Sequence, residues 1–192
     1  MDYIEEYRKV FNGGKFIRKG KEITMSEYRA FDGGGVRTLI DKLLLELENR
    51  TSVTVLDYGC GEALQWHQQT YLGKTKSLPN ILGNKLQGYY RYDPACEPFT
   101  KKPSTKFDII LCADVLEHIP DDKIESFFAE LNSFTIKTSM IFYSISTVPS
   151  NNKFISGENM HVNVKSPDDW VAILKKYSIC KVCLVFNGNY KY

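Results

Sequence analysis

The fold of this chain is decided by the stretch Val55-Leu56-Asp57-Tyr58-Gly59-Cys60-Gly61-Glu62-Ala63. The apolar run that starts at Val53 is typical of a strand buried on both faces of a sheet. An acid ends this strand, and two glycines then turn the chain toward a helix. Glycines at such a turn permit positive φ and let a ligand approach the backbone, so we expect a binding site here.

Strands and helices alternate on either side of this turn. Apolar runs predict further strands at 86–92, 107–112, 138–146 and 179–186. Helical periodicity predicts helices at 2–11, 36–47, 62 to about 72, 122–134 and 166–177, whereas 12–20 is typical of a loop. The alternation predicts an α/β fold, namely a Rossmann-like doubly wound, mainly parallel sheet with helices on both faces. Ligands in such sheets bind beyond the carboxyl ends of the strands.

Length and composition limit the function classes. The 192 residues suit one domain, and no run of 18 apolar residues indicates a membrane span. The net charge of +2, from 25 basic and 23 acidic residues, gives no indication of a nucleic-acid footprint. Five cysteines without a secretory signal indicate reduced thiols, and we therefore expect a cytoplasmic protein.

The Gly-x-Gly turn is compatible with two kinds of ligand, a dinucleotide or a cationic compound. A dinucleotide-binding turn would place a third glycine at position 64, where this chain has Leu64. Asp57 and Glu62 make the turn acidic, which suits a cationic ligand such as a sulfonium or an ammonium. The next strand ends at Asp93, which either forms a turn before Pro94 or accepts two hydrogen bonds from a ribose diol. We favour the ribose role.

The quoted stretch resembles motif I of class I S-adenosylmethionine-dependent methyltransferases, and 92–95 resembles the acid that follows it in that family. Residues 107–120 resemble the fourth-strand motif of the small-molecule, type 11-like branch, and the whole resemblance spans about 53–177. Tyr28-Arg29 and 157–162 resemble pieces of a subgroup found in phages and bacteria. The resemblance implies S-adenosylmethionine as cofactor. The positions that it implies for cofactor binding are Asp57, Tyr58, Gly59, Cys60, Gly61, Asp93, Pro94, Cys112 and Asp114.

One departure from the family pattern affects the sheet. Only 13 residues separate Asp93 from Phe107, whereas the family fits a helix and a third strand there. We therefore expect the third strand to be reduced or missing, and no residue is identified near the adenine amino group. The chain ends soon after the run at 179–186, so we expect no C-terminal antiparallel strand either.

What is missing after the fourth-strand motif excludes several types of methyltransferase. The Asn/Asp-Pro-Pro-aromatic tetrad of nucleic-acid amino-methyltransferases is absent, and Cys112 is not preceded by proline. The metal-dependent catechol type has a second Asp-Asn pair where this chain has Ser144-Ile145-Ser146-Thr147, so we predict no metal site. Cys180 and Cys183 are interpreted as buried apolar residues. The resemblance to the small-molecule branch implies an oxygen or nitrogen of a small-molecule acceptor. The segment 1–35, rich in Tyr, Lys and Arg, favours an anionic or glycan-like one.

Three side chains are candidates for catalysis. Asp114 follows the fourth-strand motif, His118 follows shortly after it, and His161 falls in the loop before the last helix. Each histidine also has a structural interpretation, as a loop or surface residue. Residues 1–35 are predicted to form an extension or lid, and 36–192 the methyltransferase domain. The alternatives are a non-catalytic nucleotide- or S-adenosylmethionine-binding module and, less favoured, an NAD-binding Rossmann protein.

Overall fold

The computed structural model describes residues 1–28, 30–67 and 77–187. Its main sheet has five strands in the order β4-β3-β5-β6-β8, and every neighbouring pair is parallel. This confirms the Rossmann-like α/β fold predicted from the alternation of strands and helices. The strands are β3 (Val53–Tyr58), β4 (Leu86–Tyr92), β5 (Phe107–Ala113), β6 (Thr135–Ser146) and β8 (Lys181–Asn187).

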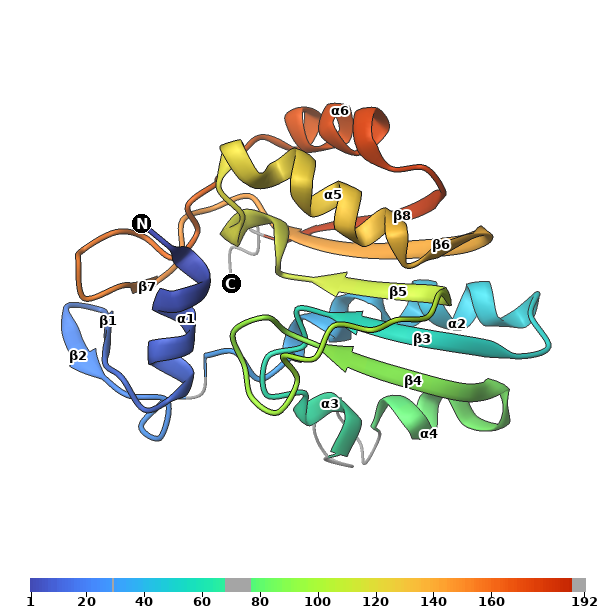
Figure 1. Ribbon diagram of the computed structural model, residues 1–192, viewed down its shortest axis with the longest axis horizontal. Helices are drawn as coiled ribbons and strands as arrows, with labels where there is room; N and C mark the ends of the chain where they lie inside the picture. The colour runs from blue at the N-terminus through green and yellow to red at the C-terminus, as the bar shows by residue number, and fades with distance from the viewer. Residues whose placement is uncertain (29, 68–76, 188–192) are drawn as a thin grey trace.

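Helices cover both faces of this sheet (Figure 1). One face carries the 3-10 helix η1 (Gly34–Leu39) with α2 (Ile40–Glu48), α3 (Leu64–His67) and α4 (Leu78–Leu82). The other face carries α5 (Ile124–Ser133) and α6 (Pro167–Tyr177). Three further 3-10 helices are η2 (Gly83–Lys85), η3 (Leu116–His118) and η4 (Asp121–Lys123).

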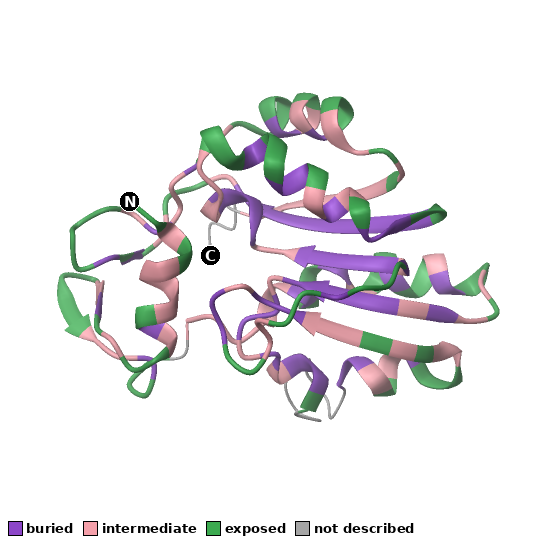
Figure 2. Ribbon diagram, in the orientation of Figure 1, coloured by how far each residue is buried: buried purple, intermediate pink, exposed green. Residues whose placement is uncertain are grey.

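The central strand β5 is buried on both faces, which explains the unbroken apolar run in its sequence. Ile109 and Leu111 point into the core beneath α2 and α4, whereas Ile110 and Cys112 point into the core beneath α5 and α6. Successive side chains of a strand face opposite sides, so a strand with helices on both faces needs apolar residues at every position. The purple band along the middle strands in Figure 2 marks this double burial.

The edges of the sheet confirm that the third strand is missing. β4 is an edge strand that pairs only with β3, and no helix or strand occurs between 93 and 106. At the other edge β8 pairs directly with β6 in parallel, so no antiparallel strand lies between them. The main sheet of the described residues therefore lacks both the third strand and the antiparallel strand of the family pattern.

A second, smaller sheet lies near the carboxyl ends of the main strands (Figure 1). It consists of β2 (Lys21–Ile23), β1 (Phe16–Arg18) and β7 (Asn152–Lys153), and both pairings are antiparallel. Together with α1 (Tyr3–Phe11) it encloses a separate small core. The prediction of a loop over 12–20 is wrong at 16–18, because Phe16 is fully buried in that core.

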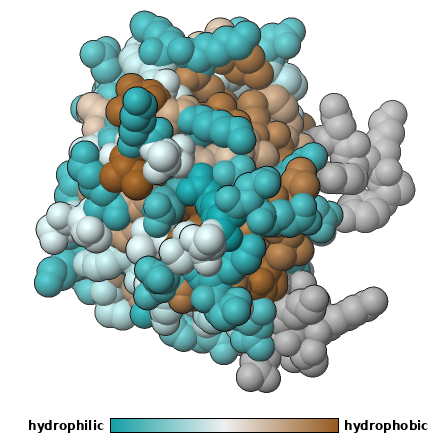
Figure 3. Space-filling view, turned by 90° about the vertical axis from the view of Figure 1, so that its right-hand side faces the viewer, coloured by the Kyte–Doolittle hydropathy of each residue, from teal (hydrophilic) through white to brown (hydrophobic). Residues whose placement is uncertain are grey.

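Hydrophilic side chains cover much of the opposite end of the molecule, with separate apolar groups among them (Figure 3). The predicted helix from 62 is described as far as His67, and its residues 68–72 and the resemblance at Arg29 lie outside the described residues. In the part of the chain that is described, no helix has the length and apolarity needed to cross a membrane.

Candidate active site

A cavity of about 1,230 Å³ lies at the carboxyl ends of the main strands. The tips of β3, β4 and β5 contribute to its wall, and so do α1 and the segment 30–35. Its volume exceeds the 300–1,000 Å³ that is usual for one small-molecule site. The cavity therefore has room for a cofactor and an acceptor together, at the place where this fold binds ligands.

The Gly-x-Gly turn forms part of this wall. Gly59 and Gly61 both have positive φ, 71° and 54°. A Cβ at Gly59 would collide with Cγ2 of Val115, and a Cβ at Gly61 would collide with the carbonyl oxygen of Phe31. That carbonyl accepts a hydrogen bond of 2.8 Å from the backbone N–H of Glu62. The glycines are therefore required by close packing within the chain as well as by the turn.

Asp93 joins the tips of β3 and β4. Its Oδ2 accepts a hydrogen bond of 3.0 Å from the N–H of Gly61, and its Oδ1 accepts 2.9 Å and 3.1 Å bonds from the N–H groups of Ala95 and Cys96. Burial raises the pKa of Asp93, and these three N–H groups act against that rise. A carboxylate has about four acceptor positions, so one remains on Oδ2 for a ligand hydroxyl.

Three of the predicted cofactor positions lie behind the cavity wall. Asp57 is buried, and its Oδ2 accepts hydrogen bonds from Gln65 Nε2 at 2.5 Å and Trp66 Nε1 at 2.6 Å. Burial raises the pKa of Asp57 to about 6. Cys60 and Cys112 are also buried and outside the cavity lining. The predicted positions that do line the cavity are Tyr58, Gly59, Gly61, Asp93, Pro94 and Asp114.

Asp114 lies where β5, β6 and β8 end side by side. Its backbone has a positive φ of 56°, and its Oδ1 accepts hydrogen bonds of 2.7 Å from Ser144 Oγ and 3.0 Å from Asn187 Nδ2. Burial raises the pKa of Asp114, while Ser144 and Asn187 lower it. Asn187 could not be found from sequence because no motif marks the end of the last strand.

His118 and His161 meet across the cavity wall, with ring centroids 4.8 Å apart. Nδ1 of His118 lies 2.9 Å from the carbonyl oxygen of Met160, and Nδ1 of His161 lies 2.7 Å from that of Val148. Burial lowers the pKa of both, to about 3 for His118, so both rings are neutral near pH 7.

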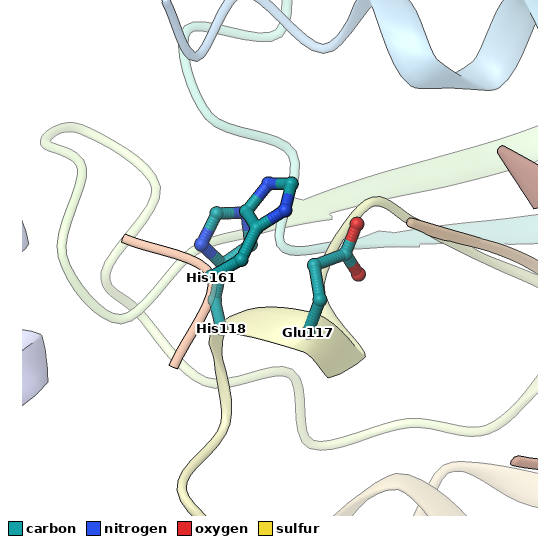
Figure 4. A group of neighbouring side chains, drawn as sticks. All are labelled: Glu117, His118 and His161. Carbon is teal, nitrogen blue, oxygen red and sulfur yellow. The ribbon is translucent and has the colours of Figure 1, made fainter. Parts of the chain in front are cut away.

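Glu117, next to His118 in the sequence, is fully buried. Burial, with the charge of Asp114, raises the pKa of Glu117 well above its ordinary value. Figure 4 shows this carboxyl beside the two imidazole rings. The structure therefore brings the three predicted catalytic residues to one region, and adds Glu117 to them.

Tyr7 is a site residue that no sequence motif marks. Its hydroxyl donates a hydrogen bond of 2.9 Å to the carbonyl of Met160 and lies 2.7 Å from Nδ1 of His118. Its ring packs edge-on against Phe31. The amphipathic pattern of 2–11 includes Tyr7 on its apolar face, which is the only signal in the sequence for this contact.

The cavity is strongly acidic. Among the described residues that line it, seven carry carboxyl groups and two carry a fixed positive charge. Even without a charge on Glu117, whose pKa is raised, six acids outnumber two bases, and a wall of this sign attracts a cationic ligand and repels a pyrophosphate. The acids are Asp2, Asp32, Asp93, Asp114, Glu117, Asp122 and Glu130, and the bases are Arg37 and Lys123.

The comparison with known families agrees with this geometry. A family model described as a methyltransferase domain matches residues 28–177. The chain belongs to this methyltransferase family. The parallel sheet and the turn at Gly59 identify the methyltransferase as a class I enzyme. No curated protein and no solved structure matches the chain.

Proposed function

We propose that this methyltransferase transfers a methyl group from S-adenosylmethionine to an oxygen or nitrogen of a small-molecule or glycan-like acceptor. The observation that carries the proposal is the hydrogen bond between Asp93 and Gly61, which joins the family's two cofactor motifs at an acidic cavity. Family membership supports methyl transfer, and the cavity chemistry supports the cofactor.

The residues present fit S-adenosylmethionine. The free acceptor position on Asp93 suits a ribose hydroxyl, and the carboxyl groups around the cavity suit a sulfonium cation. Gly59 and Gly61 bring the backbone of the turn to the cavity wall. When bound, the cofactor supplies an activated methyl group, so the protein has mainly to align the acceptor and exclude water.

Asp114 is the candidate base for a hydroxyl acceptor. It lines the cavity, and its Oδ1 is held by Ser144 and Asn187, which leaves Oδ2 to accept a proton. His161 is a second candidate, since its Nδ1 is bonded to Val148 and its Nε2 is the free ring nitrogen. The Nδ1 of His118 is held by Met160, with Tyr7 beside it. A neutral amine acceptor is already nucleophilic, so it would need none of these side chains as a base.

The N-terminal segment 1–35 acts in this proposal as a lid on the domain formed by 36–192. Five of its side chains at the cavity are aromatic, and they include Tyr3, Tyr7 and Tyr28. None of its lysines or arginines lines the cavity among the described residues. Aromatic walls and hydroxyls favour a sugar-like or aromatic acceptor over an anionic one.

Two alternatives remain distinguishable from the main proposal. The acidic cavity opposes a dinucleotide, whose pyrophosphate would face seven carboxyl groups. A non-catalytic binding module is favoured by the missing third strand, because the adenine wall is reduced. The five free thiols support a reducing compartment such as the cytoplasm.

Incubation of the enzyme with methyl-labelled S-adenosylmethionine and a fractionated cell extract tests the proposal. We expect label in the low-mass or glycan fraction, and no transfer by Asp93→Ala. Transfer to nucleic acid or protein would overturn the acceptor class. Binding of the cofactor without transfer to any fraction would favour the non-catalytic module.

A further inference from the structure

Three groups that can bind a metal ion converge on the cavity from two distant parts of the chain. Glu117 and His118 belong to η3, directly after β5, and His161 belongs to the loop that follows β7. The nitrogen and oxygen atoms that these side chains offer all lie within 4.8 Å of one another. Figure 4 shows the carboxyl group and the two rings side by side.

The hydrogen bonds of the two histidines engage Nδ1 and leave Nε2 available to a metal ion. A carbonyl oxygen lies 2.9 Å from Nδ1 of His118 and 2.7 Å from Nδ1 of His161, so each Nδ1 carries the hydrogen. Each Nε2 is then left with its lone pair, and neither has a hydrogen-bond partner among the described residues. Metal-binding histidines characteristically donate their other ring N–H to a carbonyl or a carboxylate in this way.

Glu117 supplies a second, independent observation. Its Oε1 accepts a hydrogen bond of 2.8 Å from the backbone N–H of Ser146, which fixes the carboxyl group. Its Oε2 is buried and has no hydrogen-bond partner in the described part of the chain. Buried polar atoms without a partner are rare in native proteins and call for an explanation such as an ion. A cation between this oxygen and the two Nε2 atoms provides one.

We propose that Glu117, His118 and His161 bind a divalent transition-metal cation at the acceptor side of the cavity. Two imidazoles with one carboxylate suit Zn²⁺, Mn²⁺ or Fe²⁺, whereas Mg²⁺ and Ca²⁺ prefer oxygen ligands alone. The sequence predicted no metal site because no second Asp-Asn pair follows the fourth strand. This different set of ligands is hard to find from sequence because 42 residues lie between His118 and His161.

The spacing of the ligand atoms accommodates such an ion. Three atoms at the widest spacing of 4.8 Å would each stand about 2.8 Å from an ion at their centre. Bonds from zinc to histidine and carboxylate are about 2.0–2.2 Å, so each atom needs to move inward by less than about 1 Å. The three side chains leave further coordination positions open on the cavity side, where a substrate oxygen can bind.

The role of the cation rests on the proposed function. An acceptor hydroxyl that coordinates the cation loses its proton more readily, and Asp114 on the same cavity wall can take that proton. The acceptor oxygen then forms the new bond to the methyl carbon, while the bond from that carbon to sulfur breaks. The electron pair of the broken bond stays on sulfur, and the sulfonium becomes a neutral thioether. The site therefore favours an oxygen acceptor over a nitrogen acceptor.

Metal binding can be measured without any substrate. We would strip the full-length protein with a chelator and titrate it with Mn²⁺, followed by electron paramagnetic resonance, and with Zn²⁺, followed by calorimetry. We expect one ion per chain. His161→Ala should weaken binding by at least about 100-fold, since loss of outer-shell partners alone costs 10- to 100-fold. Glu117→Gln should do the same, and it retains the size of the buried side chain.

His67→Ala is the matched control, because His67 is exposed and lies outside the cavity lining. It should bind the ion as the unmodified chain does. Absence of stoichiometric binding at 1 mM metal would overturn the proposal. Binding by His161→Ala and Glu117→Gln as tight as that of the unmodified chain would overturn it too. Binding of S-adenosylhomocysteine by the metal-free protein is measured separately. Cofactor binding without metal binding defeats only the cation site, and metal binding without cofactor binding defeats only the proposed function.

Discussion

The carboxylate of Asp93 accepts a hydrogen bond of 3.0 Å from the backbone N–H of Gly61, across 32 positions of sequence. This bond joins the acid at the end of β4 to the glycine turn after β3. Both residues line the cavity, so one short contact sets the spacing of the two motifs that would hold the cofactor.

Replacement of Asp93 should affect cofactor affinity and stability together. Asp93→Ala removes an acceptor for the ribose. It also leaves three backbone N–H groups without their hydrogen-bond acceptor. Charge-assisted hydrogen bonds are worth about 1.5–3 kcal/mol, so we expect affinity for S-adenosylhomocysteine to fall about 10- to 150-fold. Calorimetry measures the affinity, and urea unfolding measures the stability.

Asp108→Ala is the matched control for Asp93→Ala. Asp108 accepts hydrogen bonds of 2.8 Å and 2.7 Å from the backbone N–H and hydroxyl of Thr54, away from the cavity. The Asp108→Ala protein should be less stable than the unmodified chain but should bind the cofactor with the same affinity. Unchanged affinity in a folded Asp93→Ala protein would show that Asp93 only shapes the turn.

Gly59 should be intolerant of any side chain. Gly59→Ala places a Cβ against Cγ2 of Val115 at a residue whose φ is 71°. The left-handed backbone alone costs about 1–2 kcal/mol, and the collision adds to it. Gly20→Ala, at a φ of 78° with open space around it, isolates the backbone cost.

The double variant Gly59→Ala/Val115→Ala separates the two causes further. The double variant should regain the unfolding free energy that the collision with Val115 costs. The cost of the left-handed backbone at position 59 should remain. Equal unfolding free energies for Gly59→Ala and Gly20→Ala would contradict the close packing of Val115 on the turn.

Asp57 should make stability depend on pH. Its pKa in the fold, about 6, lies above the unfolded value near 3.9, so the protonated form favours folding. That stabilisation is complete below pH 4 and is lost as pH rises through 6. Asp57→Asn keeps an acceptor for Gln65 and Trp66 and cannot ionise.

We therefore expect Asp57→Asn to exceed the unmodified chain in stability by up to about 3 kcal/mol at pH 8, and by much less at pH 4. Urea unfolding across this range measures the difference. A difference in unfolding free energy that does not vary with pH would show that burial does not raise the pKa of Asp57.

Asp114 should act on turnover more than on affinity. With a hydroxyl acceptor, Asp114→Asn should lower the rate of methyl transfer about 10²- to 10⁴-fold and leave cofactor affinity nearly unchanged. Ser144→Ala removes a hydrogen bond that lowers the pKa of Asp114. The acid limb of its pH-rate profile should therefore move to higher pH. A large loss of affinity in Asp114→Asn, with no change in rate, would assign the residue to binding.

Tyr7 should fix the N-terminal helix to the site. Tyr7→Phe removes the hydroxyl between Met160 and His118 but keeps the ring packing with Phe31. We expect a loss of about 1 kcal/mol and faster amide exchange in α1. Tyr3→Phe, with a largely exposed hydroxyl, is the comparison. Equal exchange in both variants would show that the Tyr7 hydroxyl does not hold the helix.

Local patterns in the sequence were sufficient for the main sheet. The unbroken apolar runs at 53–57 and 107–112 identify strands buried on both faces, and the 13 residues after Asp93 correctly predict the missing strand. Ser166 caps α6 through a hydrogen bond from the N–H of Asp169, as its pattern indicates. These features depend on neighbours along the chain, so the sequence reveals them.

The small sheet and the histidine cluster depend on distant contacts. β1 pairs with β7 across more than a hundred positions, and strands of two or three residues carry no periodicity. His118 meets His161 only because the loop after β6 folds back over η3. The helix predicted over 122–134 also starts later than expected, because the 3-10 helix η4 precedes α5 and makes Lys123 the cap residue.

Titration of the unmodified enzyme with S-adenosylhomocysteine and with NAD tests the central claim most directly. Calorimetry should show one S-adenosylhomocysteine site per chain, binding of S-adenosylmethionine in competition with it, and no heat from NAD. Saturable NAD binding that S-adenosylhomocysteine does not displace would contradict the account, and so would the absence of S-adenosylhomocysteine binding at millimolar concentration.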